Sequence, residues 1–155
     1  VAGLFPLKSK NVNEKKKRKI IVLIPGYRED EVIINVAKEA LTQDYGLLNY
    51  DVAIIADGFK KETISALKKI EVKVFEVQLA FSTKSRALNA VLNQLDDSYE
   101  IAVVLDADNL MAPDFLTRIN AAFDNGYLAV QGHRIAKNMN TSFAILDAVS
   151  EEMNN

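Results

Sequence analysis

Two aspartates, Asp106 and Asp108, stand one residue apart directly after the apolar run 101–105. Carboxylates this close repel each other, and a carboxylate beside a buried strand is costly unless another charge compensates it. A divalent cation or a helix N-terminus would do so. The helix-capping alternative suits Asp114, which follows Pro113, better than Asp106. The pair therefore predicts a site for Mg²⁺ or Mn²⁺, with phosphate oxygens and water completing the coordination.

Cations and a further acid follow two other apolar runs. Lys84 and Arg86 lie where a loop becomes a helix, a position that disfavours positive charge but offers free N–H groups to an anion. The two cations therefore predict neutralisation of a phosphate. Asp57 ends the run 52–56 and precedes a glycine, which is ordinary turn chemistry. Its alternative role is to accept a hydrogen bond from the imide N–H of a nucleobase.

The first strand ends in the sequence IPGYRED at residues 24–30. We expect Pro25 to end the strand, Gly26 to permit a tight turn and Tyr27 to reach the sheet edge. Glu29 is expected at the start of the next helix, where it either lines the site or complements the helix dipole.

A last candidate lies near the end of the sequence. Arg134 follows a predicted strand and could pair with a phosphate or with one of the acids. His133, the single histidine, is interpreted as a hydrogen-bonded structural residue.

The elements that must position these residues alternate between strand and helix. This order predicts an α/β fold, with a mostly parallel, Rossmann-like sheet and helices on both faces. The strand carboxyl ends then share one edge, where ligands bind. The expected strands are 19–25, 51–57, 72–78, 100–108 and 127–135, and the expected helices are 29–43, 60–70, 85–95, 113–126 and 141–153.

Composition limits the alternatives. The chain has 155 residues, a net charge of −2 and no cysteine, so bulk charge gives no sign of nucleic-acid binding and a thiolate metal site is impossible. We expect a basic linker over residues 1–18, or a juxtamembrane segment, and one domain over residues 19–155. The chain begins at valine and stops within a predicted helix, so we expect a fragment of a longer protein.

These motifs resemble the GT-A glycosyltransferases of family 2, in particular the polysaccharide-synthase-like branch. IPGYRE is similar to the Pro-x-Tyr-x-Glu opening of the family, and IADGFKKET resembles its second-strand Asp motif. KSRALN is similar to its Lys-x-x-Ala-Leu segment, and LDADN to its Asp-x-Asp metal motif. The resemblance covers residues 19–155 in the family's order.

The resemblance implies inverting transfer of a sugar from a nucleoside diphosphate, usually UDP, to a hydroxyl of a saccharide or lipid-linked acceptor. It implies that Asp57 contacts the base and that Asp108 holds Mg²⁺ or Mn²⁺, which acts as a Lewis acid on the leaving diphosphate. Asp106 would approach the metal and the donor sugar or ribose. The other implied donor-binding residues are Pro25, Tyr27, Glu29, Lys84 and Arg134.

The family's general base, an aspartate in a Glu-Asp motif, is expected beyond Asn155, as is the acceptor half of the fold. We therefore expect the 155-residue piece to be soluble and inactive by itself. The full-length protein is expected to be associated with a membrane and to act at its cytoplasmic face, without a nucleic-acid partner.

Other interpretations fit less of the sequence. A sugar-nucleotide pyrophosphorylase needs a glycine-rich first loop, and PGYRED holds one glycine. A Rossmann oxidoreductase needs G-x-G-x-x-G, which is absent from the sequence. A receiver-like domain needs an acidic pair where Pro25 and Gly26 stand. A non-catalytic nucleotide-sugar sensor stays open.

Overall fold

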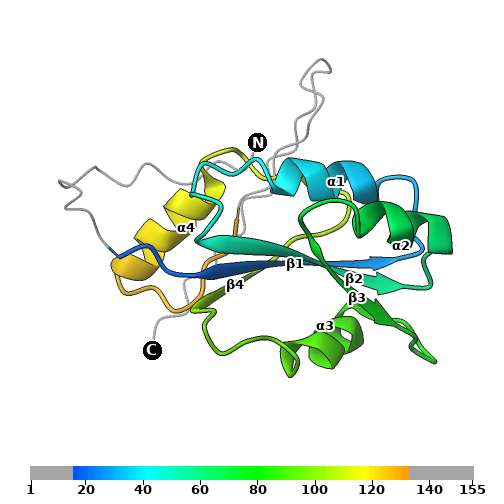
Figure 1. Cartoon of the computed structure of the whole chain (residues 1–155). Coiled ribbons are helices and arrows are strands. Elements are labelled where there is room, and N and C mark those ends of the chain that lie inside the picture. The colour runs from blue at the N-terminus through cyan, green and yellow to red at the C-terminus, as the bar shows by residue number, and fades with distance from the viewer. Residues whose placement is uncertain (1–15, 133–155) are drawn as a thin grey trace, which may run out of the picture.

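The computed structural model describes residues 16–132, in which four strands and four helices alternate along the chain (Figure 1). This order confirms the expected α/β architecture. The elements are β1 (Ile20–Tyr27), α1 (Ile33–Ala40), β2 (Tyr50–Asp57), α2 (Lys61–Leu67), β3 (Lys73–Val77), α3 (Lys84–Leu92), β4 (Ile101–Val104) and α4 (Phe115–Asp124).

The four strands form one parallel sheet in the order β3-β2-β1-β4. The chain moves outward from β1 to β3 and then returns to the other side of β1. Because crossovers between parallel strands are right-handed, this reversal places α1 and α2 on one face and α3 on the other. Figure 1 shows this arrangement, with α4 on the face of α1 and α2. The switch point lies between the carboxyl ends of β1 and β4, where open α/β sheets bind ligands.

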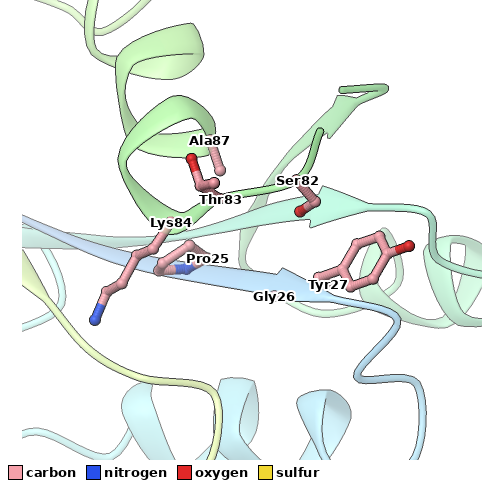
Figure 2. Close-up of a pocket in the computed structure, with 7 residues that line it drawn as sticks. All are labelled: Pro25, Gly26, Tyr27, Ser82, Thr83, Lys84 and Ala87. Atoms are coloured by element: carbon pink, nitrogen blue, oxygen red, sulfur yellow. The ribbon is translucent and has the colours of Figure 1, made fainter. Parts of the chain in front are cut away.

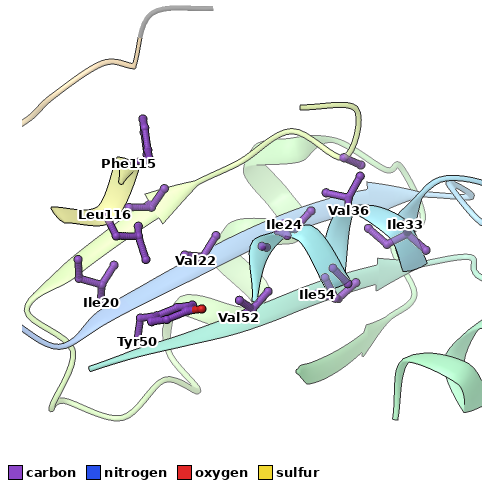
Figure 3. Close-up of a cluster of buried hydrophobic side chains, with 14 of the residues drawn as sticks. Ile20, Val22, Ile24, Ile33, Val36, Tyr50, Val52, Ile54, Phe115 and Leu116 are labelled. Carbon is purple, nitrogen blue, oxygen red and sulfur yellow. The ribbon is translucent and has the colours of Figure 1, made fainter. Parts of the chain in front are cut away.

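The two central strands explain why the sequence reads as continuous apolar runs. Ile20, Val22 and Ile24 on β1 face the layer of α1, α2 and α4, whereas Ile21 and Leu23 face α3. All five are at most 1% exposed, so both sides of β1 are core. Figure 3 shows the side with Ile20, Val22 and Ile24. Burial on two faces requires apolar residues at successive positions rather than an alternating pattern.

The first helix is shorter than expected. Helix α1 begins at Ile33, so the acids at 29–31 precede its first turn. The backbone N–H groups of Val32 and Ile33 donate to the carbonyl of Glu29 at 3.2 and 3.1 Å, which makes residues 29–32 a turn that leads into the helix. Glu29 is therefore a residue of the β1–α1 turn and not of the helix itself.

Pro25 does not end the first strand, contrary to expectation. Strand β1 continues to Tyr27, and Pro25 pairs with Ile55 of β2. The ladder with β4 does end here, because the Leu105 N–H donates to the Leu23 carbonyl at 2.9 Å and Pro25, two residues further along the same side, has no N–H to continue it. Beyond this point β1 and β4 separate.

Strand β4 is also shorter than predicted and is not buried on both faces. Ile101 and Val103 are buried, whereas Ala102 and Val104 are exposed. In the described chain β4 pairs with β1 on one side and has no strand on the other. The strand expected over 127–135 is wrong for 127–132, which contain no strand, and its remainder and the helix at 141–153 lie outside the described residues.

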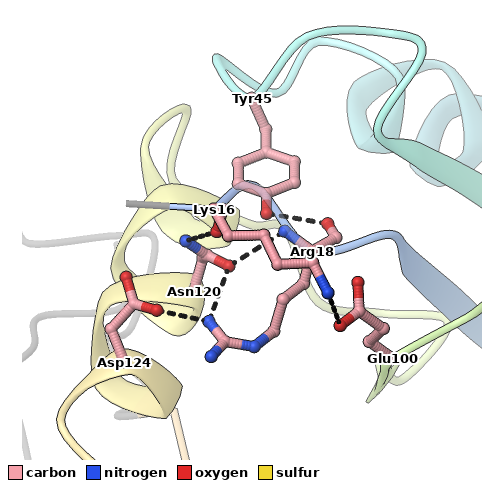
Figure 4. A network of polar contacts seen from close by, with 6 residues as sticks. All are labelled: Lys16, Arg18, Tyr45, Glu100, Asn120 and Asp124. Atoms are coloured by element: carbon pink, nitrogen blue, oxygen red, sulfur yellow. Dashed lines mark hydrogen bonds and ion pairs between the residues drawn. The ribbon is translucent and has the colours of Figure 1, made fainter. Parts of the chain in front are cut away.

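Residues 16–18, at the end of the expected linker, contact the domain (Figure 4). The Arg18 guanidinium pairs with Asp124 of α4 at 2.5 Å, and the Arg18 N–H donates to Asn120 Oδ1 at 3.2 Å. Tyr45 Oη donates to the Arg18 carbonyl at 2.8 Å. Burial of the Tyr45 side chain raises the pKa of its phenol.

Within residues 16–132, none of the helices is long and apolar enough to cross a membrane.

Candidate functional site

Two hollows flank the carboxyl end of β1 and share the residues Pro25, Gly26 and Tyr27. The first, which we call the α3 hollow, has a volume of about 110 Å³ and lies against the N-terminus of α3. Figure 2 shows Lys84 and Tyr27 on either side of Pro25. Its other lining residues are Ser82, Thr83, Lys84 and Ala87.

The start of α3 supplies polar groups to this hollow. Thr83 caps the helix, because its hydroxyl accepts the Arg86 N–H at 3.3 Å. Lys84 is the first helical residue and lines the hollow. Arg86 does not line either hollow; its guanidinium donates to the Phe81 carbonyl at 3.4 Å instead. Of the two cations predicted to neutralise phosphate, the structure therefore places only Lys84 at the site.

Asp57 lies beside this hollow on the same face of the sheet. It is the register partner of Tyr27. Alternate residues of a strand share one face, and Ala53 and Ile55 belong to the hydrophobic clusters between the sheet and α3. Asp57 is 4% exposed, and its buried Oδ2 has no hydrogen-bond partner among the described residues. A buried carboxylate oxygen without a donor is unusual and costly. A turn residue has no need of such burial, whereas a group that binds a ligand N–H does.

The second hollow, which we call the β4 hollow, opens where β1 and β4 separate after Pro25. It has a volume of about 290 Å³ and combines the turn after β1 with the loop after β4. Its lining residues are Pro25, Gly26, Tyr27, Glu29, Asp106, Ala107 and Asp108. Three of the predicted acids, from segments almost eighty residues apart, are thus brought to one hollow at the switch point of the sheet.

An ion pair links the two hollows. The Lys84 ammonium pairs with Asp106 Oδ1, so a residue of the α3 hollow contacts one of the β4 hollow. Asp106 Oδ2 accepts a hydrogen bond from the Asn109 side chain at 3.3 Å, and the Asn109 N–H donates to the Asp106 carbonyl at 3.0 Å. Asp106 is therefore held from two directions, while Asp108 is exposed to solvent.

The donor set fits a hard divalent cation in part. Carboxylate oxygens suit Mg²⁺ and Mn²⁺, and Asp106 and Asp108 line the same open hollow. Among residues 16–132, no group of three or more acidic or histidine side chains is arranged to hold a metal ion. The protein thus offers two carboxylates, and phosphate oxygens and water would have to supply the other ligands.

The turn after β1 is fixed to the turn after β2. Asp30 Oδ1 accepts the Lys60 N–H at 2.9 Å and the Thr63 hydroxyl at 2.5 Å, so it ties the turn after β1 to the start of α2. These hydrogen bonds lower the pKa of the Asp30 carboxyl. Arg28 has a positive φ of 55° and stacks on Tyr27, with 5.0 Å between its guanidinium and the ring centroid.

The sequence matches a family model described as "Glycosyltransferase like family 2" over residues 17–154. The chain belongs to this glycosyltransferase family. The match agrees with the resemblance seen in the motifs and favours the glycosyltransferase interpretation over a pyrophosphorylase or an oxidoreductase. No curated protein matches the chain.

Solved glycosyltransferase structures share the fold. The mannosyltransferase PcManGT from Pyrobaculum calidifontis, in complex with GDP-Man and Mn²⁺, is 26% identical, with a TM-score of 0.56 over 69% of this chain. TarS from S. aureus, residues 1–349 in complex with UDP, is 21% identical, with a TM-score of 0.58 over 69% of this chain. The alignment covers 32% of each of those chains, so this family 2 chain spans about a third of their length.

Asp108 and six further predicted site residues of this family 2 domain lie in or beside the two hollows. They are Pro25, Tyr27, Glu29, Asp57, Lys84 and Asp106. Arg134 lies outside the described residues. Sequence reasoning gave no role to Asn109, although Asp and Asn are typical turn residues. Nor did it give one to Asp30.

Proposed function

We propose that this chain forms the donor-binding part of a glycosyltransferase that transfers a sugar from a nucleoside diphosphate to a hydroxyl acceptor, with inversion and with Mg²⁺ or Mn²⁺. The single observation that carries the proposal is the meeting of Asp106, Asp108 and Lys84 at the switch point, next to Tyr27, whose register partner on β2 is Asp57. Two carboxylates, a lysine and a buried acceptor correspond to the metal, the diphosphate and the base of one ligand.

Each group has one task in this proposal. The buried Asp57 carboxylate accepts the imide N–H of the base, which the family resemblance implies is uracil. Lys84 neutralises phosphate, and Tyr27 with Pro25 forms the apolar wall between the two hollows. Asp106 and Asp108 hold the divalent cation, which when bound supplies a Lewis acid for the leaving diphosphate. The mannosyltransferase that is 26% identical was solved with a nucleotide sugar and Mn²⁺, which supports this class of ligand.

The family resemblance puts the general base beyond Asn155. We therefore expect the 155-residue polypeptide to bind donor without transferring sugar, because loss of a general base typically costs about 10²- to 10⁴-fold in rate. A longer chain that includes the base would transfer sugar, which a non-catalytic sensor would not. From the same resemblance we propose that the acceptor is a saccharide or a lipid-linked molecule, and that the full-length protein is associated with a membrane.

The test is calorimetric titration of the 155-residue chain with UDP and with GDP, each with and without Mn²⁺. We expect binding of one nucleotide to require the metal and to be lost in Asp108→Ala. The matched control is Glu39→Ala, which removes an exposed carboxylate on α1 and should leave binding unchanged. Equal, metal-independent binding of both nucleotides would contradict the proposed donor site. Measurable sugar transfer by this chain would contradict its expected inactivity.

A further inference from the structure

We propose that Lys84 is an exchangeable counter-ion, which neutralises Asp106 in the empty site and moves to the diphosphate when metal and nucleotide bind together. This inference rests on the proposed function and deepens it. It starts from the ion pair between Lys84 and Asp106, which joins α3 to the loop after β4.

The pair occupies groups that both ligands need. Within residues 16–132, Asp106 and Asp108 are the aspartates that line the β4 hollow, and Lys84 is the only lysine or arginine that lines either hollow. A cation that binds Asp106 must compete with the lysine ammonium. A diphosphate that binds Lys84 must compete with the Asp106 carboxylate. Each ligand by itself therefore has to break the pair between Lys84 and Asp106.

The two ligands together break the pair only once. When metal and diphosphate arrive as a unit, Asp106 exchanges an ammonium for the divalent ion, and Lys84 exchanges a carboxylate for a phosphate oxygen. Both exchanged groups are charged and paired before and after binding. The free-energy cost of breaking the ion pair is shared by the two ligands, so each ligand raises the affinity for the other. By thermodynamic linkage, the metal raises the nucleotide affinity by the same factor as the nucleotide raises the metal affinity.

The surroundings permit this exchange. Lys84 is half exposed and sits on the first turn of α3, so its side chain can turn between the hollows without moving the sheet. Asp106 is anchored by Asn109 through its other oxygen, so the carboxylate stays in place when the lysine leaves. The mobile partner is the lysine and the fixed partner is the aspartate.

The first arm of the test measures Mn²⁺ alone, by the electron paramagnetic resonance signal of the free ion, in the wild type and in Lys84→Met. Removal of the competing ammonium should tighten Mn²⁺ binding by about fivefold or more, the usual lower range of such coupling. Lys38→Met removes an exposed lysine from the last turn of α1 and should change nothing. Unchanged or weaker Mn²⁺ binding in Lys84→Met would overturn the inference.

The second arm separates exchange from simple charge effects and measures nucleotide binding in EDTA. Asp106→Asn frees Lys84 and should tighten metal-free UDP or GDP binding by several-fold. Asp108→Asn removes the same charge from the same hollow but leaves the pair intact, so its gain should be clearly smaller. Equal gains in the two variants would overturn the exchange.

The two proposals fail differently. If the wild type binds nucleotide with Mn²⁺ but the variants behave as plain charge changes, only the counter-ion exchange is wrong. If the wild type binds neither Mn²⁺ nor nucleotide under any of these conditions, the donor-binding function is wrong and the exchange is overturned with it.

Discussion

Tyr27 and Asp57 are register partners at the carboxyl ends of β1 and β2, and they lie on the face of the sheet that α3 covers. Tyr27 is half exposed, whereas Asp57 is buried with one carboxylate oxygen unpaired within the described chain. A ring open to solvent beside a buried acceptor is the arrangement expected where a planar ligand lies on the ring and donates to the acid. In the proposed function this oxygen accepts the N–H of the base, and until then it is a buried acceptor without a donor among the described residues.

Asp57→Leu should therefore stabilise the protein and weaken ligand binding. Leucine has nearly the same shape and removes the unpaired buried oxygen, so the free energy of unfolding should rise by about 1–3 kcal/mol. Nucleotide affinity should fall by about one to two orders of magnitude, the value of a hydrogen bond to a charged group. Urea denaturation and calorimetry measure the two effects. A variant that loses stability, or keeps full affinity, would contradict this role.

Gly26 is a second position where a small change should have a large effect. A Cβ at Gly26 would lie 2.8 Å from the Phe59 ring, and Gly26 lines both hollows. Gly26→Ala should cost about 1–3 kcal/mol, the usual effect of overpacking. In the Phe59→Ala background, Gly26→Ala should cost much less than in the wild type, because the clash disappears. Additive losses in this double-mutant cycle would show that the ring is not the obstacle.

Asp30 should stabilise the turns around the site through the N-terminus of α2. Asp30→Ala removes the acceptor for Lys60 and Thr63 and should lower the free energy of unfolding by about 1 kcal/mol at pH 6. The exposed neighbour Glu31→Ala is the control. Thermal unfolding of the three proteins measures the difference.

The same variant predicts a pH dependence. Because the folded protein lowers the pKa of Asp30 below its ordinary value of 3.8, its stabilising effect is present above that pH and is lost as the pH falls through the lowered value. The difference in stability between wild type and Asp30→Ala should thus be constant from pH 7 to 5 and shrink below pH 4. A difference that grows on acidification would contradict the sign.

Asn120 should show whether residues 16–18 belong to the domain. Its Oδ1 accepts from the Arg18 backbone and guanidinium at 3.2 and 3.3 Å, and its Nδ2 donates to the Lys16 carbonyl at 3.3 Å. Asn120 is buried, so Asn120→Ala should cost about 1–3 kcal/mol by leaving these groups unpaired. Asn89→Ala, on the exposed side of α3, should cost much less. Similar losses would favour the boundary expected at residue 18.

The period and composition of the sequence determine the elements and their faces. The unbroken apolar runs of β1 and β2 predict burial on two faces. The helical spacing of Val32, Val36 and Ala40 predicts the buried side of α1; Val36 and Ala40 are buried, whereas Val32 precedes the helix and is exposed. Alternation of strand and helix then predicts the parallel sheet and its ligand-binding edge. These properties are local, because each depends on residues within a few positions of one another.

The arrangement of the site was decided only in three dimensions. Lys84 and Asp106 are 22 residues apart in the sequence. They meet because β4 pairs with the edge of β1 that β2 does not occupy, and because α3 covers the sheet face opposite to α1 and α2. The sequence predicts that Pro25 ends the strand, but Pro25 ends only the ladder between β1 and β4 and stays paired with β2. The missing N–H would have pointed towards β4, so only that neighbour is affected. The burial of Asp57 follows from the packing around the ends of β1 and β2, which no local pattern records. Charge pairing and burial depend on neighbours brought together by the strand order, and so the chemistry of the site was predicted while its internal connections were not.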